Sequence, residues 1–196
     1  MTTVSTLSPE KPAARRRDAE ATRAAILAAA KKHFATSGYD GAYLRDIAAD
    51  AGADAALINR YFGGKDGLFA AALKDSIAPD AISQWDRASF AHDVARMMAG
   101  HAHQHGERMH AFQFLLRAAT SPTTAPLLNL AVQERFMEPI REWIGGDNVE
   151  ARARLVASVF IGLMVERLIR DEPLAGAERE IFIERTAALL QSLVDN

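Results

Sequence analysis

The sequence predicts an all-α protein of about nine helices, and three observations support this fold class. About a fifth of the 196 residues are Ala, which has the highest intrinsic helix propensity. Val, Ile and Thr do not alternate with polar residues over any strand-length window. Gly and Pro recur at intervals that suit the ends of helices rather than hairpin turns.

The first third of the chain is expected to hold a tail and then four helices. Residues 1–17 contain two prolines and the run Arg15–Arg16–Arg17, which predicts a flexible basic tail. Glycine and proline then mark where each helix ends. The expected helices are 19–37 before Gly38, 43–51 before Gly52, 54–62 with Asp54 as N-cap and Gly63–Gly64 after it, and 65–78 before Pro79.

The rest of the chain is expected to form five further helices. Phe90, Val94, Met97, Met98 and His101 recur at helical spacing and predict one apolar face. The expected helices are 89–103, 107–120, 123–144 with a kink at Pro139, 148–170 and 175–194.

Composition and charge narrow the class of protein. The absence of cysteine excludes a disulfide framework, a cysteine zinc site and a thiol nucleophile. No apolar run approaches 18 residues and the N-terminus resembles no secretory signal, so we expect a cytoplasmic protein without a membrane partner. Residues 1–75 carry 11 basic and 9 acidic side chains (+2), whereas residues 76–196 carry 12 and 16 (−4). This asymmetry favours a nucleic-acid surface near the N-terminus, although chance scatter of surface charge explains it equally well.

Residues 43–62 form the most informative pattern in the chain. Two short helices are joined by Ala51–Gly52–Ala53–Asp54, and a glycine-containing turn of this length is typical of a helix-turn-helix. The second helix of such a motif fits the DNA major groove and presents its N-terminal residues to the base edges. By spacing alone, an ordinary pair of helices inside a bundle is an equally good interpretation.

The surrounding segment resembles the N-terminal DNA-binding domain of the TetR family of transcriptional regulators. About fifty residues carry the resemblance. The matching elements are Thr22–Arg23, Ile26–Leu27–Ala28–Ala29–Ala30, Phe34 through Gly38–Tyr39, Arg45–Asp46–Ile47–Ala48, Ala51–Gly52, Asn59–Arg60–Tyr61–Phe62, and Lys65 with Leu68. Residues 151–176 are similar, more weakly, to the C-terminal dimerisation helix of many members.

The resemblance implies an organisation and a function. It implies a helix-turn-helix domain at 18–64, a connecting helix at 65–78, and a ligand-binding and dimerisation domain at 79–196. A family member of this kind is a homodimeric repressor, with no cofactor, that a small-molecule effector releases from a palindromic operator. No phosphate-binding loop, nucleophile elbow or zinc-protease motif points to an enzyme, and Glu134 with Glu138 fits an exposed acidic pair.

Candidate DNA contacts follow from the positions that match the family. The candidates are Tyr43, Arg45, Asp54, Ala55, Ala56, Asn59, Arg60, Tyr61 and Lys65, together with Arg15, Arg16 and Arg17. The family usually has Thr or Ser where this chain has Ala42 and Tyr43, Tyr where it has Asn59, and Ser where it has Gly64. Asn59 suits bidentate bonding to adenine, or it faces phosphate or solvent. The arginine run either enters a minor groove or is a solvated tail.

The helix expected at 148–170 is apolar nearly all round, so it must be buried on more than one side. A second subunit is the natural cover, and a central helix within a monomer is the alternative. The candidate dimer contacts are Leu155, Val156, Val159, Phe160, Gly162, Leu163, Leu189 and Leu193.

An apolar cavity between the middle helices would suit a small apolar or aromatic effector. The candidate lining is Phe90, Val94, Met97, His101, Met109, Phe112, Leu116, Phe136, Ile140 and Trp143, and plain core is the alternative for each of them. His101, His103 and His105 are close in sequence, but without cysteine and at a helix end they predict no metal site.

Overall fold

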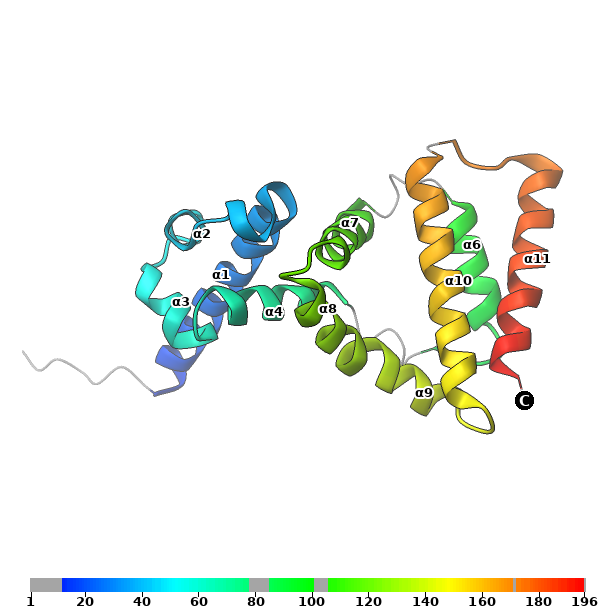
Figure 1. The fold of residues 1–196 in the computed structure, drawn as a ribbon, viewed down its shortest axis with the longest axis horizontal. Helices are drawn as coiled ribbons and strands as arrows, with labels where there is room; N and C mark the ends of the chain where they lie inside the picture. Colours follow the sequence, from blue (N-terminus) through cyan, green and yellow to red (C-terminus); the bar gives the residue numbers. More distant parts are fainter. Residues whose placement is uncertain (1–11, 78–84, 101–105, 171, 196) are drawn as a thin grey trace, which may run out of the picture. The chain divides into compact units, whose positions relative to one another are not determined.

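The protein is all-helical, as the sequence predicts. The computed structural model describes residues 12–77, 85–100, 106–170 and 172–195, and the regular structure within these ranges is entirely helix (Figure 1). These residues form nine helices when α8, the π-helical turn after it and α9 are counted as one continuous segment. The chain folds as two compact units, Met1–Ala72 and Leu73–Asn196.

The first unit contains α1 (Pro12–Gly41), α2 (Leu44–Asp50), α3 (Ala55–Phe62) and most of α4 (Lys65–Ser76). Helix α1 begins at Pro12, so the expectation of a flexible tail through residue 17 is wrong for residues 12–17. Proline suits a first helical turn, and Arg16 pairs with Glu20 one turn later at 3.3 Å, which supports the helix here. Residues 1–11 lie outside the described part of the chain.

The predicted break at Gly38 is confirmed. Gly38 has a φ of +70° and a ψ of −177°, which interrupt the helical path and let the chain after it fold back. Tyr39 then packs its ring edge-on against Phe69 at 5.1 Å, and its hydroxyl donates a hydrogen bond to the carboxylate of Asp66 on α4. This bond, together with burial and the nearby negative charge, raises the pKa of Tyr39 to about 12.

A small apolar core holds the first unit together. Ile26 and Phe34 of α1, Ile47 of α2, Ile58 of α3 and Leu68 of α4 are at most 1% exposed. Each such side chain contributes about 1.5–3 kcal/mol relative to the exposed state. Short helices are marginal in water, so α2 and α3 depend on this burial.

Gly67 fixes the path from α3 into α4. A Cβ added at this position would lie 1.7 Å from the carbonyl oxygen of Phe62, far inside any real contact. The obstacle is backbone, which cannot swing aside as the end of a flexible side chain would. Glycine is therefore required in the first turn of α4, although it is a poor helix former.

The second unit contains α6 (Phe90–Ala99), α7 (Gly106–Thr120), α8 (Ala125–Val132), α9 (Glu138–Ile144), α10 (Val149–Ile169) and α11 (Gly176–Val194). Helices α6, α10 and α11 lie side by side (Figure 1) and bury one core between them. Trp85, Phe90 and Trp143 extend that core, with ring centroids of neighbouring pairs 4.6–5.7 Å apart.

The kink expected at Pro139 takes the form of a π-helical turn, Gln133–Met137, between α8 and α9. The N–H of Glu138 bonds to the carbonyl of Gln133, five residues earlier. Proline has no N–H to continue the usual ladder, so the turn before it widens instead.

Arginine side chains tie the ends of helices together in the second unit. Arg87 donates from both terminal nitrogens to the carbonyls of Trp143, Ile144 and Val194 over 2.7–2.9 Å. Arg152 donates to carbonyls that follow α9 and that end α11. Cationic groups at helix C-termini satisfy these carbonyls and complement the helix dipoles.

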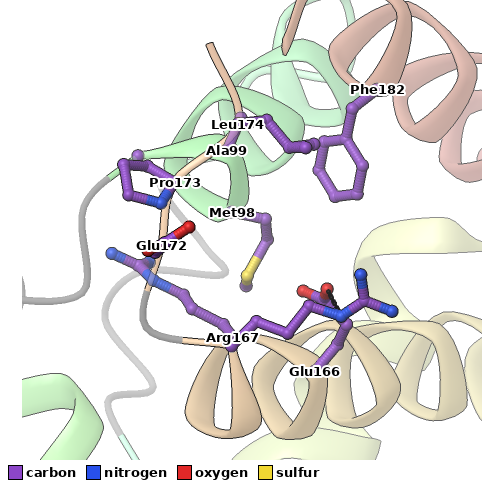
Figure 2. Close-up of a pocket in the computed structure, with 10 residues that line it drawn as sticks. Met98, Ala99, Glu166, Arg167, Glu172, Pro173, Leu174 and Phe182 are labelled. Carbon is purple, nitrogen blue, oxygen red and sulfur yellow. Dashed lines mark ion pairs between the residues drawn. The ribbon is translucent and has the colours of Figure 1, made fainter. Parts of the chain in front are cut away.

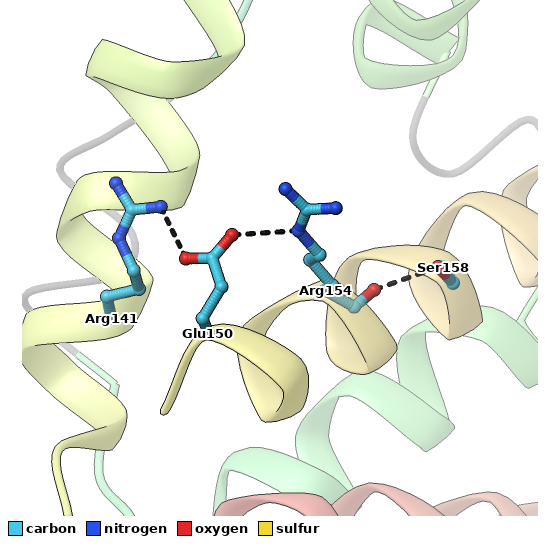
Figure 3. Close-up of polar contacts among 4 residues, drawn as sticks. All are labelled: Arg141, Glu150, Arg154 and Ser158. Atoms are coloured by element: carbon cyan, nitrogen blue, oxygen red, sulfur yellow. Dashed lines mark hydrogen bonds and ion pairs between the residues drawn. The ribbon is translucent and has the colours of Figure 1, made fainter. Parts of the chain in front are cut away.

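Glu150 joins α9 to the start of α10. Its carboxylate accepts hydrogen bonds from Arg141 at 2.9 Å and from Arg154 at 2.7 Å (Figure 3). The two guanidinium groups lower the pKa of Glu150, the bond from Arg154 having the larger effect. The hydroxyl of Ser158 donates to the carbonyl of Arg154 at 2.8 Å.

Replacing Gly67 with Ala tests the steric requirement at the start of α4. Helix propensity alone predicts a gain of about 1 kcal/mol, whereas the clash with the Phe62 carbonyl predicts a loss of about 1–3 kcal/mol. We expect a loss in urea unfolding. The reverse exchange one turn later, Ala71→Gly, serves as the control and should cost about 1 kcal/mol. A Gly67→Ala protein that melts above the wild type would show that no such contact exists.

Replacing Tyr39 with Phe tests the bond to Asp66 through its pH dependence. Because the folded-state pKa lies near 12 and the ordinary value is 10, both states keep the proton below pH 10 and the contribution is complete there. Between pH 10 and 12 the unfolded state alone loses the proton, so this stabilisation falls as the pH rises.

We therefore expect Tyr39→Phe to lower the free energy of unfolding by about 0.5–1.5 kcal/mol at pH 8. The difference from wild type should shrink above pH 10 in urea titrations. Tyr61→Phe is the control, since no hydrogen bond joins that hydroxyl to another of the described residues. A difference in unfolding free energy between wild type and Tyr39→Phe that stays constant up to pH 11.5 would contradict the hydrogen bond from Tyr39 to Asp66.

Candidate nucleic-acid interface

The turn between α2 and α3 is built by local hydrogen bonds. Gly52 has a φ of +63°, and its N–H bonds to the carbonyl of Ala49 at 3.0 Å. The N–H of Ala53 reaches the carbonyl of Ala48 at 2.9 Å, which completes a Schellman motif. This pair of bonds ends α2 and turns the chain sharply into α3.

Asp54 caps α3, as the sequence predicts. Its side chain accepts a hydrogen bond from the N–H of Ala56 at 2.7 Å, and Gly63 ends the helix in the left-handed conformation. The cap leaves the carboxylate at the positive end of the helix, where negative charge is stabilised. Both ends of α3 are therefore fixed by residues that the sequence identifies.

One face of α3 is exposed and the opposite face is buried. Ile58 is fully buried, whereas Ala55, Ala56, Asn59 and Arg60 are exposed at positions that share a helical face. The small alanines leave room at the N-terminal end of this face, and the two polar side chains follow one turn later. The exposed face of α3 therefore begins with two small side chains and continues with two polar ones.

Two departures from the family pattern are neighbours in the structure. A Cβ added to Gly64 would lie 3.7 Å from the Oδ1 atom of Asn59, and Gly64 has a φ of +114°. The small residue at position 64 therefore lies next to the shortened side chain at position 59. No feature of the sequence alone connects these two positions.

The start of α2 carries exposed groups. Tyr43 is the N-cap of α2 but makes no capping bond with its side chain, so the missing Thr or Ser is not replaced as a cap. Its ring is 59% exposed, and the guanidinium of Arg45 lies 5.8 Å from the ring centre. Arg45 also pairs with Asp46 at 3.2 Å.

The cations around this face are held in different ways. Lys65 places its ammonium 4.7 Å from the ring centre of Tyr39 and donates to the carbonyl of Asp40 at 3.4 Å. The guanidinium of Arg60 lies 6.0 Å from the ring of Tyr61, which is half-buried. Arg16 and Arg17 are exposed on the first turns of α1, and the side chain of Arg15 lies outside the described residues.

Residues that the sequence did not single out also support this interface on its buried side. Arg23 lies over the ring of Phe62 at 4.9 Å, which secures the end of α3 against α1. Gly67 and the bond from Tyr39 to Asp66 fix the start of α4. A glycine one turn into a predicted helix was a visible signal, because propensity alone disfavours it there.

Most residues of the predicted ligand cavity lie in the core of the second unit or pack against it. Phe90, Val94, Met109 and Ile140 belong to the buried core of the second unit, as the core alternative requires. Half-buried against or near that core are Met97, Phe112, Leu116, Phe136 and Trp143, while His101 lies outside the described residues. These positions do not line the pocket at the ends of α6 and α10, and the effector cavity among them stays a prediction.

The pocket lies at the C-terminal ends of α6 and α10 and has a volume of about 430 Å³ (Figure 2). Met98, Arg167 and Phe182 are among the side chains that line it, together with the chain at 172–174. Arg167 is 6% exposed and donates to the carbonyl of Met97 at 2.8 Å. Burial lowers the pKa of its guanidinium.

The candidate dimer residues divide into two groups. Leu155 and Leu189 are 51% and 49% exposed, and Gly162, two turns after Leu155 on α10, is exposed as well. Val156 is 2% exposed and faces the core of its own subunit, so its assignment to a dimer contact is wrong. Val159, Phe160, Leu163 and Leu193 are half-buried against that core.

Within the described residues, no three histidine, aspartate or glutamate side chains gather in a way that would hold a metal ion. His101, His103 and His105 lie outside those residues. None of the described helices combines the length and the apolar character that crossing a membrane requires.

Comparisons with known proteins agree with this architecture. Residues 26–72 match the model for bacterial regulatory proteins of the tetR family, and residues 88–194 match the tetracyclin repressor-like C-terminal domain. An HTH-type transcriptional repressor of Streptomyces coelicolor is 46% identical over 67 residues, which is 34% of this chain and 35% of that protein. The alignment thus spans about a third of that relative's length.

Solved structures share the whole fold. The repressor NalD of Pseudomonas aeruginosa aligns over 85% of this chain and 95% of its own, with a TM-score of 0.61 and 20% identity. The multidrug binding protein EbrR, in complex with proflavin, aligns over 88% and 99%, with a TM-score of 0.60 and 20% identity. A TetR-family regulator from Streptomyces coelicolor aligns over 95% and 99%, with a TM-score of 0.51 and 25% identity. With its helix-turn-helix and with both domains matched, the chain belongs to the TetR family of bacterial transcriptional regulators.

Proposed function

We propose that the protein is a homodimeric repressor that binds a palindromic operator and leaves it when a small-molecule effector binds. The exposed face of α3, with Ala55, Ala56, Asn59 and Arg60 over the buried Ile58, is the observation that carries this proposal. The similarity to a repressor of Streptomyces coelicolor supports repression rather than activation. The protein acts by binding, and we propose no enzymatic activity.

The exposed face of α3 reads the base edges. Asn59 reaches adenine, Arg60 reaches a base or a phosphate, and the two alanines allow close approach or contact a thymine methyl group. Phosphates are held by Tyr43, Arg45, Tyr61 and Lys65, while Arg15, Arg16 and Arg17 add attraction at the start of α1. The carboxylate of Asp54 caps the N-terminal end of α3. Its negative charge there favours contacts with the exocyclic amino groups of the bases.

Two subunits meet through α10 and α11. Four large apolar side chains of these helices are 49–76% exposed: Leu155, Ile161 and Ile169 of α10 and Leu189 of α11. Exposing this much apolar surface to water is unfavourable. A second copy of the same face would cover them, and Gly162 would let the two α10 backbones approach closely. A symmetric pair of subunits then places two α3 helices on one operator.

Effector release rests on the second domain. EbrR is a multidrug binding protein whose structures hold proflavin or ethidium, and it shares the fold of this chain. An effector that binds one of two conformations more tightly shifts the population away from the operator-binding form. A coupling of about 1–3 kcal/mol gives roughly 5–150-fold release. The competing function is a constitutive repressor whose second domain serves only to dimerise.

Selection of bound duplexes from random DNA tests operator recognition. We expect the recovered sites to be inverted repeats whose half-site centres lie about 34–36 Å apart. Against such a site, Asn59→Ala should cost about 1–3 kcal/mol and relax the preference at one base pair in each half-site.

Two results would argue against this assignment. Recovery of asymmetric single half-sites, each bound by one subunit, would contradict the dimeric repressor. An equal loss across all operator variants would place Asn59 on a phosphate instead. Arg96→Ala serves as the control, because that exposed arginine lies on α6 in the second unit.

Replacing Leu155 with Glu tests the dimer face. A charge in the centre of an apolar interface should shift light-scattering mass toward the 21.3 kDa subunit and weaken operator binding at least about tenfold, or about 1.4 kcal/mol. Leu130→Glu is the matched control, since Leu130 is 64% exposed on α8, away from the proposed face. A wild-type protein that is monomeric at micromolar concentration would exclude the dimer, as would equal effects of both variants.

A further inference from the structure

Lys65 and Asp66 are adjacent opposite charges at the start of α4, and each is engaged by the same tyrosine. The ammonium of Lys65 lies 4.7 Å from the ring centre of Tyr39 and donates to the backbone carbonyl of Asp40 at 3.4 Å. The carboxylate of Asp66 accepts a hydrogen bond from the hydroxyl of Tyr39. Lys65 forms no ion pair with any of the described residues. Tyr39 therefore keeps two neighbouring charges apart.

Adjacent opposite charges near the start of two other helices do pair. In the first turn of α2, Nε of Arg45 lies 3.2 Å from a carboxylate oxygen of Asp46. Near the start of α11, the guanidinium of Arg179 lies 2.9 Å from the carboxylate of Glu180. Consecutive helical positions are thus close enough for long side chains to meet. The separation of the two charges on α4 follows from their contacts with Tyr39 rather than from their spacing.

The ring of Tyr39 is itself anchored to the core of the first unit. It stacks on Phe34 with the ring centres 6.3 Å apart, and it meets Phe69 edge-on at 5.1 Å. Both phenylalanines are at most 2% exposed. A cation that rests on an anchored ring has fewer conformations to lose when it binds a ligand, so the contact prepares Lys65 for binding.

The charge of Lys65 lies where it can attract an anion. Lys65 is the first residue of α4, and the N-terminal end of a helix is its positive end. An unpaired ammonium beside such a helix end adds to the attraction for a phosphate. An ion pair between Lys65 and Asp66 would cancel most of this attraction, because the carboxylate would neutralise the ammonium.

We infer that Tyr39 is a positioning residue for DNA binding: its hydroxyl occupies Asp66 and its ring holds Lys65, so that the lysine stays unpaired and available to a DNA phosphate. The inference rests on the contact between Lys65 and phosphate proposed above, and it adds the residue that keeps this contact possible. Tyr39 need not touch DNA itself. Loss of its hydroxyl frees the carboxylate of Asp66 to pair with Lys65.

A double-mutant cycle on DNA binding tests the inference. The probe is a fluorescent duplex of mixed sequence, long enough for two subunits, because phosphate contacts do not depend on base sequence. By fluorescence anisotropy, Lys65→Ala should weaken binding and reduce its salt slope by about one unit. Tyr39→Phe keeps the ring and should weaken binding about two- to fivefold, the range expected when an exposed ion pair forms in the free protein.

A second substitution separates positioning from stability. Tyr39→Phe combined with Asp66→Asn should bind DNA as tightly as Asp66→Asn alone, because no carboxylate remains to pair with Lys65. In urea unfolding this double variant should still be less stable than the wild type, since the hydrogen bond from the hydroxyl is absent. Asp50→Asn is the matched control. It removes the same charge from an exposed position on α2 and should leave the weakening by Tyr39→Phe in place.

Three results would overturn the inference. The first is DNA binding by Tyr39→Phe that equals that of the wild type. The second is a weakening by Tyr39→Phe that persists equally with Asp66→Asn and with Asp50→Asn, since Tyr39 would then act only through stability. The third is wild-type binding by Lys65→Ala, although recovery of inverted repeats by the same protein would keep the proposed repressor. A wild-type protein that binds no DNA would overturn both proposals.

Discussion

The burial of Ile58 is the constraint on which the DNA-binding surface depends. Helix α3 has eight residues, too few to be stable alone in water, so it persists because Ile58 is locked into the core of the first unit. Once that side chain points inward, helical geometry places Ala55, Ala56, Asn59 and Arg60 outward. The Asp54 cap and the left-handed Gly63 then set where this face begins and ends. The residue that anchors α3 and the residues proposed to contact DNA therefore lie on opposite faces of one short helix.

The second unit depends on how helix ends are satisfied. Arg87 and Arg152 gather the terminal carbonyls of α9 and α11, and Arg167 takes a carbonyl near the end of α6. Each guanidinium neutralises part of a helix dipole while it bonds to carbonyls at the helix end, most of them partly buried. At the shared end of α6 and α10, Glu166 pairs with Arg170, and Glu172 also lines the pocket there.

Membership of the TetR family fixes the architecture more firmly than the ligand. Solved structures at 18–25% identity share the fold of this chain. In this chain the middle helices use their large apolar residues to fill the core, as Phe90 and Ile140 do. A pocket lies where residues 172–174 meet the C-terminal ends of α6 and α10.

The sequence by itself determined the fold class, the helix-turn-helix, the Asp54 cap and the breaks at Gly38 and Gly52. These are local matters, decided by helix propensity, by capping side chains and by residues that accept a positive φ. Even the family was evident from some fifty residues of pattern. The α1 start at Pro12 was misjudged because arginine runs occur in helices as readily as in tails.

The tertiary structure alone decided which side of an apolar helix meets the subunit's own core. Periodicity shows that α10 is apolar all round, but only packing against α6 and α11 turns Val156 inward and leaves Leu155 exposed. The same holds for Gly67, whose necessity comes from the Phe62 carbonyl, and for the pocket, where Met98, Glu172 and Phe182 meet from distant parts of the chain. Local sequence encodes helices through neighbouring residues, whereas cavities and faces arise from contacts between residues far apart in sequence, which no short window records.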